Sequence, residues 1–158
     1  MLALFTFFKN IQLTANQLII IVCCYVVFIH NIPFLSETFS AITALNEYSI
    51  GFLLSVPFFL LSLTLIFISA FALRFLLKPL LTFIVLSSAM IFYASLTYGV
   101  IFDYGMVQNT VETDSAEALT YVNFYALLFV ALFGGVPAFA IAKVKVTDSP
   151  LLKIFRSG

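Results

Sequence analysis

The sequence predicts an all-α integral membrane protein, a four-transmembrane-helix bundle with a polar segment on the outer side between spans 3 and 4. Of its 158 residues, 63% are apolar and only 9% are charged, and the mean hydropathy is +1.18. An ordinary soluble domain has about 25% charged residues, and it cannot hide so many apolar side chains from water. The composition therefore excludes a soluble enzyme, a nucleic-acid-binding protein and a disordered chain.

Four apolar stretches predict four membrane-spanning helices. A bilayer core of about 30 Å requires about 20 helical residues, whereas the strands of a membrane barrel are shorter and alternate in polarity. The stretches that qualify, none of which contains a charged residue, are approximately residues 11–29, 50–71, 80–102 and 119–142. The length of the chain allows one membrane domain, residues 1–158, and leaves no room for a second folded unit.

The first apolar stretch is interpreted as an uncleaved span. Lys9 precedes it, as a basic residue precedes the apolar part of a signal peptide. However, the chain continues with His-Asn-Ile-Pro-Phe at residues 30–34, which contains no small-x-small cleavage site. We therefore expect this stretch to remain in the membrane.

The distribution of charge predicts the orientation of the spans. Every basic residue lies before the first span, between the second and third, or after the fourth: Lys9, Arg74, Lys78, Lys143, Lys145, Lys153 and Arg156. The other two connections, residues 30–49 and 103–118, contain no Lys or Arg and hold every acidic residue except Asp148. Because short cytoplasmic loops are enriched in Lys and Arg, both termini of this multi-pass protein are predicted to be cytoplasmic.

The fourth span contains features that affect helix packing. Pro137 removes a backbone donor and is expected to bend the helix. Ala131 with Gly135, and Gly134 with Ala138, place small residues four apart, which lets another helix approach closely. Ordinary packing within the bundle explains these small residues.

Few residues suggest catalysis. The chain has one histidine and two adjacent cysteines, with no His, Asp and Glu set at ligand spacing, so no metal site or catalytic residue is predicted in it. It also lacks a phosphate-binding glycine loop and a nucleophile elbow. His30 follows the first span, where an interfacial side chain is expected.

The outer segment between the third and fourth spans, residues 103–118, is the most polar part of the chain. Asn109, Thr113 and Glu117 recur every four residues, so on a helix they turn by only about 40° per step and share one face. An amide, a hydroxyl and a carboxylate on one face suit a cationic head group. The alternative is structural, because Asp114 with Glu117 forms a capping-box pattern that would open the fourth span.

The same segment resembles the lipid A phosphoethanolamine transferases, which include the mobile colistin-resistance enzymes. Residues 103–109 (DYGMVQN) followed by 113–117 (TDSAE) resemble the outer-face signature of that family. Three further pieces occur in the order found in the family: residues 31–34 (NIPF), 76–80 (LLKPL) and 142–146 (AKVKV). The resemblance extends over nearly the whole chain.

This resemblance implies a location in the bacterial inner membrane, which makes the polar segment periplasmic. In the family, a periplasmic catalytic domain with zinc and a threonine nucleophile takes phosphoethanolamine from phosphatidylethanolamine and passes it to a lipid A phosphate. The products of this reaction give polymyxin resistance. The family's membrane-side contacts to the donor lipid match Asn109, Thr113 and Glu117, which are therefore the predicted substrate-binding residues.

The resemblance also implies a fifth span and the catalytic domain, whereas this sequence stops at Gly158. We therefore expect a fragment, a truncated product or one part of a split protein, which anchors the enzyme, contributes to the donor site and is inactive alone. The alternative is a free-standing four-span protein, such as a small transporter or an interaction subunit. Small carriers usually need a carboxylate in the first span, where this chain has only Gln and Asn.

Overall fold

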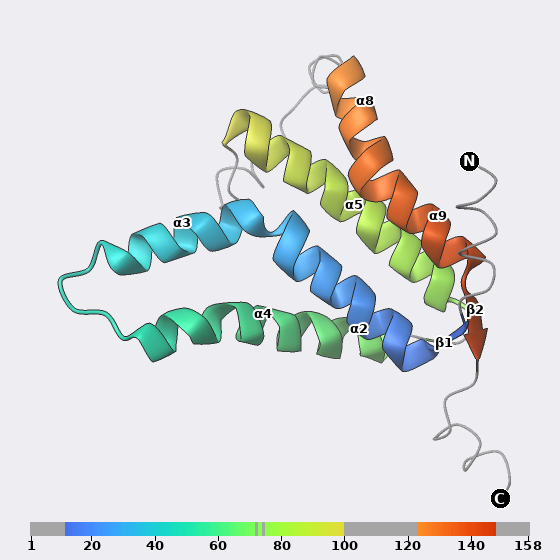
Figure 1. The fold of residues 1–158 in the computed structure, drawn as a ribbon, viewed down its shortest axis with the longest axis horizontal. Coiled ribbons are helices and arrows are strands. Elements are labelled where there is room, and N and C mark those ends of the chain that lie inside the picture. Colours follow the sequence, from blue (N-terminus) through green and yellow to red (C-terminus); the bar gives the residue numbers. More distant parts are fainter. Residues whose placement is uncertain (1–11, 72, 74, 100–122, 148–158) are drawn as a thin grey trace, which may run out of the picture.

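The computed structural model describes residues 12–71, 73, 75–99 and 123–147 of the chain, which are mostly helical (Figure 1). Three helices are long and apolar enough to cross a membrane: α4 (Ile50–Phe71), α5 (Leu77–Tyr98) and the continuous helix Phe124–Lys143. The number of spans rises to four if the bent pair of helices nearest the N-terminus, Ala15–His30 and Ile32–Thr43, counts as one span. The helical, membrane-spanning character predicted from the sequence is therefore present.

The first helix begins later than the apolar pattern suggested. It consists of α2 (Ala15–Tyr25) and the π-helical turn η1 (Val26–His30). Thr14 caps α2 by accepting from the Gln17 N–H at 3.3 Å, while Gln17 Oε1 accepts from the Thr14 N–H at 2.9 Å. This capping box satisfies backbone donors that the first helical turn leaves unpaired, which fixes the start at Ala15.

The connection predicted over residues 30–49 is in large part a helix, α3 (Ile32–Thr43). It is bent by 59° from the helix Ala15–His30. Pro33 lies in its first turn, where the missing N–H costs nothing and the fixed φ favours a helix. The sequence predicts a connecting loop here, but most of the polar side chains of this stretch, including Glu37, lie on the exposed side of α3.

The long helices otherwise follow the apolar stretches, with ends set by local chemistry. α4 covers the same residues as the second predicted span. α5 ends at Gly99, whose left-handed φ of 63° suits glycine and stops the helix before the predicted Phe102. The last helix runs through α8 (Phe124–Val130), the π-helical turn η2 (Ala131–Gly135) and α9 (Val136–Lys143).

The fold is not purely helical, because two short strands pair at one end of the bundle. β1 (Gln12–Thr14) and β2 (Lys145–Thr147) form a parallel ladder with Leu13 opposite Val146. The strands directly precede the first helix and follow the last, so the packing of those helices brings two extended segments side by side (Figure 1). Their backbone groups then pair with one another.

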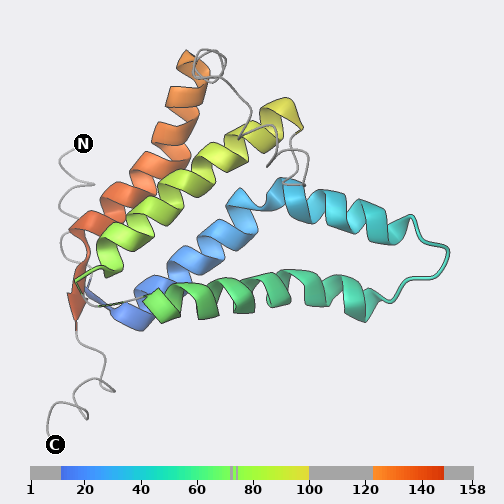
Figure 2. The same ribbon diagram turned by 180° about the vertical axis from the view of Figure 1, so that it is seen from behind.

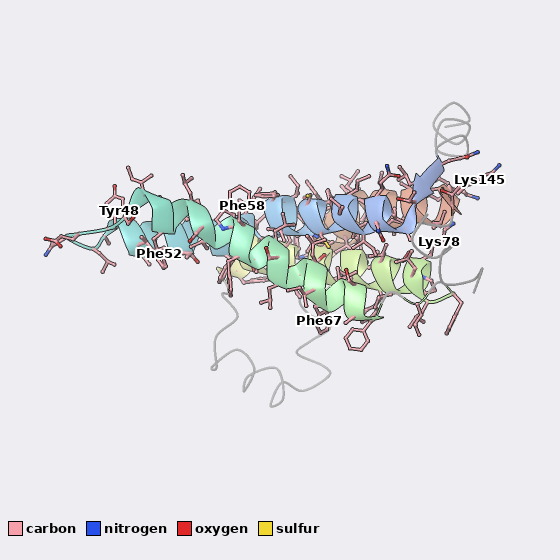
Figure 3. The ribbon with its side chains drawn as sticks, turned by 90° about the horizontal axis from the view of Figure 1, so that it is seen from below. Tyr48, Phe52, Phe58, Phe67, Lys78 and Lys145 are labelled. Carbon is pink, nitrogen blue, oxygen red and sulfur yellow. The ribbon has the colours of Figure 1, made fainter. Side chains whose placement is uncertain are left out.

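The core lies where α2, α4, α5 and α9 meet. Its fully or nearly fully buried side chains include Leu18, Val22, Cys23, Ile68, Leu81, Val85 and Ile141. By contrast, α4 exposes large apolar side chains along its length, among them Phe52, Phe58, Phe59, Ile66 and Phe67 (Figure 3). Such an outer surface is suited to lipid and not to water.

Of the small residues predicted to pack within the bundle, Gly134 and Ala138 are buried, whereas Ala131 is exposed. A Cβ at Gly134 would lie 3.0 Å from the Ala89 Cβ and 3.2 Å from Leu86 Cδ2, so the absence of a side chain lets α5 approach η2 closely. At the adjacent Gly135 the nearest atom, the Val130 carbonyl oxygen, would be 3.9 Å away. Only Gly134 is therefore required by contact with a neighbouring helix.

We expect Gly134→Ala to destabilise the bundle relative to Gly135→Ala. Both substitutions gain the same helix propensity, but only the first crowds α5, at a cost typical of overpacking of about 1–3 kcal/mol. Thermal unfolding in detergent should give a lower midpoint for Gly134→Ala. Equal midpoints for the two variants would contradict the close approach.

Candidate functional site

The predicted substrate-binding residues Asn109, Thr113 and Glu117 lie outside the residues that the structure describes. What it does describe are the two helix ends that flank residues 100–122. α5 ends at Tyr98 and Gly99 on one side, and α8 begins after Asn123 on the other. These ends set the boundaries within which the polar segment connects the third and fourth spans.

The two flanking helices are tied together by side chains. The Tyr93 hydroxyl on α5 donates to Asn123 Oδ1 at 3.2 Å. The same oxygen accepts from the Ala126 N–H at 2.8 Å and so caps α8. The Tyr93 ring also packs against Phe129, with ring centroids 5.4 Å apart. One tyrosine and one asparagine thus define where the helix after the polar segment starts.

Asn123 also bears on the capping alternative. The sequence offered Asp114 and Glu117 as the residues that open the fourth span, but α8 starts at Phe124 and has its own cap. The sequence contained this signal, since an Asn directly before an apolar run is a favoured N-cap. Asn123, and not Asp114, is therefore the N-cap of α8.

A second polar group lies in the middle of the bundle, centred on His30. His30 is only 4% exposed and is buried in the bundle, so the interfacial position expected from the sequence is wrong. Nδ1 lies 2.6 Å from Ser88 Oγ and Nε2 lies 3.2 Å from the Phe133 carbonyl oxygen. Ser88 and Phe133 are both near the middle of their long helices, which places His30 at the same depth.

The Phe133 carbonyl can accept these bonds because of Pro137. In an α-helix this carbonyl accepts from the N–H of the fourth residue on, which here is a proline and has none. The Tyr25 hydroxyl donates to it at 2.8 Å, and His30 Nε2 approaches it as well. A carbonyl only accepts, so Nε2 is the protonated nitrogen. In the neutral ring Nδ1 then accepts from the Ser88 hydroxyl at 2.6 Å, in place of the Val85 carbonyl, which lies 3.1 Å from the same hydroxyl.

Aromatic rings enclose this group. His30 stacks on Phe92 with centroids 5.5 Å apart and meets the edge of Tyr25 at 4.7 Å. Phe92 in turn contacts Phe129 and Phe133 edge-on at 5.3 and 5.7 Å. The His30–Ser88 pair has the reach of a base and a nucleophile, but a ring this deeply covered offers no access to a substrate.

Charged side chains of the described residues separate between the two ends of the bundle. Lys78, Lys143 and Lys145 lie at the end where β1 and β2 pair, and Lys78 Nζ donates to the Ala142 carbonyl at 3.0 Å (Figure 3). Glu37 and Glu47 lie on α3 and in the α3–α4 connection, at the opposite end of α4. Within the described residues, no three His, Cys, Asp or Glu side chains group as metal ligands would.

The fold and the exposed apolar surface define a helical integral membrane protein, and comparisons with known proteins identify its family. A sequence profile described as "Phosphoethanolamine transferase EptA/EptB" matches residues 60–157, more than half of the chain. The chain therefore belongs to the phosphoethanolamine transferase family, of which it represents the N-terminal membrane domain. The family predicted from the sequence motifs is confirmed.

Individual relatives agree with this assignment. Phosphatidylethanolamine transferase Mcr-2 of Escherichia coli is 29% identical over 98 residues, and Mcr-1 of the same organism is 30% identical over 99 residues. Each match covers 62% of this chain but 18% of the relative, so the chain spans about a fifth of their length.

A solved structure supports the fold. The integral membrane protein lipooligosaccharide phosphoethanolamine transferase A (EptA) from Neisseria meningitidis superposes with a TM-score of 0.76 at 24% identity, over 94% of this chain and 27% of that one. At this identity the likeness concerns the arrangement of the helices alone.

We expect Asn123→Ala to destabilise the outer end of the bundle more than Tyr93→Phe. The first removes both the cap and the tie to α5, at about 0.5–2 kcal/mol for the cap, while the second removes one exposed hydrogen bond. Asn123→Asp keeps an oxygen acceptor for both donors and is the control. Unfolding in SDS-containing mixed micelles should rank Asn123→Ala lowest, and equal stability of the Ala and Asp variants would contradict the capping role.

Proposed function

We propose that this chain is the membrane domain of a phosphoethanolamine transferase that moves phosphoethanolamine from phosphatidylethanolamine to a lipid A phosphate, a modification that gives polymyxin and colistin resistance. The observation behind the proposal is the family match over residues 60–157, which includes the polar segment and the spans on both sides of it. The domain anchors the enzyme in the bacterial inner membrane and contributes to the site for the donor lipid.

The transfer chemistry belongs to the complete enzyme. The matched relatives, named for transfer of phosphatidylethanolamine, are several times longer than the stretch that this chain covers. In the proposal, the zinc and the threonine nucleophile are supplied by a periplasmic catalytic domain. A polypeptide of these 158 residues produced by itself is therefore expected to show no transfer. The family match does not favour a free-standing small transporter.

The donor lipid is proposed to bind at Asn109, Thr113 and Glu117. Phosphatidylethanolamine has an ammonium group, which a carboxylate pairs with, while an amide and a hydroxyl fix the orientation of the head group. In this proposal Glu117 serves the head group, since the start of α8 has Asn123 as its cap. The Tyr93–Asn123 contact holds the two helix ends from which this segment extends.

Both termini are proposed to be cytoplasmic. Lys78, Lys143 and Lys145 lie at one end of the bundle with the β1–β2 pair, and Glu37 and Glu47 lie at the other end of α4. The basic end corresponds to the cytoplasmic side under the positive-inside rule. The polar segment after α5 then lies on the periplasmic side, where a catalytic domain would meet the donor lipid.

Reporter fusions test this orientation. A reporter active only in the periplasm should be silent when fused after Gly158 and active when fused near Asn109, because the basic residues hold their end in the cytoplasm. A reporter active only in the cytoplasm should give the opposite pattern as the control. Periplasmic activity at Gly158 would contradict the proposed topology.

Glu117→Gln tests the donor site in the complete enzyme, made by joining this chain to the fifth span and catalytic domain of a family member. If Glu117 pairs with the ammonium, loss of this charge-assisted contact should cost about 1.5–3 kcal/mol, or roughly 10- to 150-fold in kcat/KM. Asn109→Ala and Thr113→Ala should lower transfer as well.

Glu112→Gln makes the same chemical change in the same segment off the predicted stripe and should leave transfer unchanged. Transfer is measured with a fluorescent phosphatidylethanolamine, at matched membrane expression of every variant. Near-normal activity of Glu117→Gln would contradict the proposed pairing of Glu117 with the ammonium of the donor lipid. The chain without a catalytic domain provides the background rate.

A further inference from the structure

His30 lies at the bend of the first helix and also contacts the helices on the other side of the bundle. His30 ends η1, and the chain turns there by 59° into α3. From this position its ring contacts Ser88 on α5 and the Phe133 carbonyl of η2. One side chain thus connects the bend to two other helices.

Packing alone does not call for a histidine at this place. An ionisable ring in an apolar interior is costly unless its polar atoms are satisfied, and here both nitrogens have partners. An aliphatic side chain could fill a similar volume without those partners. A histidine differs from an aliphatic side chain in forming directional hydrogen bonds. Two such bonds at fixed angles set the rotation of η1 about its axis.

The backbone at both contact points departs from the regular α-helix in a way that fits this role. η1 and η2 are both π-helical turns, and the Asn31 side chain closes the other side of the bend by donating to the Val26 carbonyl at 2.9 Å. Pro137 removes the α-helical donor of the Phe133 carbonyl that His30 approaches. Single π-helical turns in helices frequently mark functional positions.

We propose that His30 is a positioning residue that sets the angle at which α3 leaves the bundle. α3 and α4 pack side by side and form an arm that diverges from α5 and α8 (Figures 1 and 2). α3 has 12 residues and is therefore about 18 Å long, so a change of about 20° at the bend moves its far end by roughly 6 Å. The His30 contacts hold this arm at one distance from α8.

Distances between pairs of spin labels, measured by double electron–electron resonance, test the proposal. The measurement needs no transferase activity, so its outcome is independent of the proposed function. The labels are introduced in a Cys23→Ala, Cys24→Ala background. Ser40→Cys on α3 and Leu127→Cys on α8 report the distance between the arm and α8. Met90→Cys on α5 with Leu127→Cys reports the rest of the bundle. All three labelled positions are exposed.

We expect His30→Leu to shift or broaden the Ser40–Leu127 distance by several ångströms and to leave the Met90–Leu127 distance unchanged. His30→Gln keeps a donor and an acceptor and should restore the original distance. Phe92→Leu removes the stacked ring but neither hydrogen bond, and should not shift the arm.

An unchanged arm distance in His30→Leu, with the bundle folded, would overturn the proposal, because the ring would then act only by filling space. If His30→Leu does not fold, Ser88→Ala decides, since it removes one partner at a partly exposed position. A shifted or broadened arm distance in Ser88→Ala supports the positioning role, and an unchanged one overturns it.

Discussion

The bundle depends on how one backbone carbonyl is satisfied in an apolar interior. Pro137 deprives the Phe133 carbonyl of its α-helical donor, and a buried carbonyl without a partner is costly where no water is available. Tyr25 and His30, from the first helix, approach that carbonyl instead. The first and last helices are thereby joined at mid-depth.

Other contacts join the helices at different depths in the bundle. Beside Phe133, Gly134 lets α5 approach η2 closely, and Ser88 on the same part of α5 contacts His30. At one end, the β1–β2 ladder joins the beginning of the first helix to the exit of the last. At the other end, Tyr93 and Asn123 join α5 to α8. Exposed apolar side chains lie on α4, α5 and α8 alike, and such a surface is suited to lipid.

Hydropathy was sufficient to predict the long helices because the bilayer imposes the same requirement on every spanning segment. It failed where local chemistry decides. Hydropathy predicts a loop over residues 30–49, but most of the polar side chains there lie on the exposed side of α3. It also predicts an interfacial His30, because the 59° bend after His30 leaves no mark in the hydropathy pattern. The alternation of polar and apolar residues over 143–147 was an available signal for β2.

For the candidate site, the sequence motifs identified the family correctly, since a signature of specific residues needs no knowledge of the fold. The three donor-lipid residues lie outside the described part of the chain, so their arrangement stays a prediction from spacing and resemblance. The mid-bundle group could not be predicted, because its residues come from three segments far apart in sequence, Tyr25 with His30, Ser88, and Phe133, and only the fold brings them together. The one local signal for this group in the sequence is Pro137, which lies four residues after Phe133 and leaves its carbonyl without an α-helical donor.

The state of the His30 ring tests this account most directly. His30 is the single histidine of the chain, so ¹⁵N-labelled histidine reports this site alone in a nitrogen NMR spectrum of the protein in bilayers. We expect two separate ring resonances, one from a protonated Nε2 and one from an unprotonated, hydrogen-bonded Nδ1, with slow exchange of the Nε2 proton with water. Averaged resonances of a ring that exchanges rapidly between tautomers, as in an exposed histidine, would contradict it.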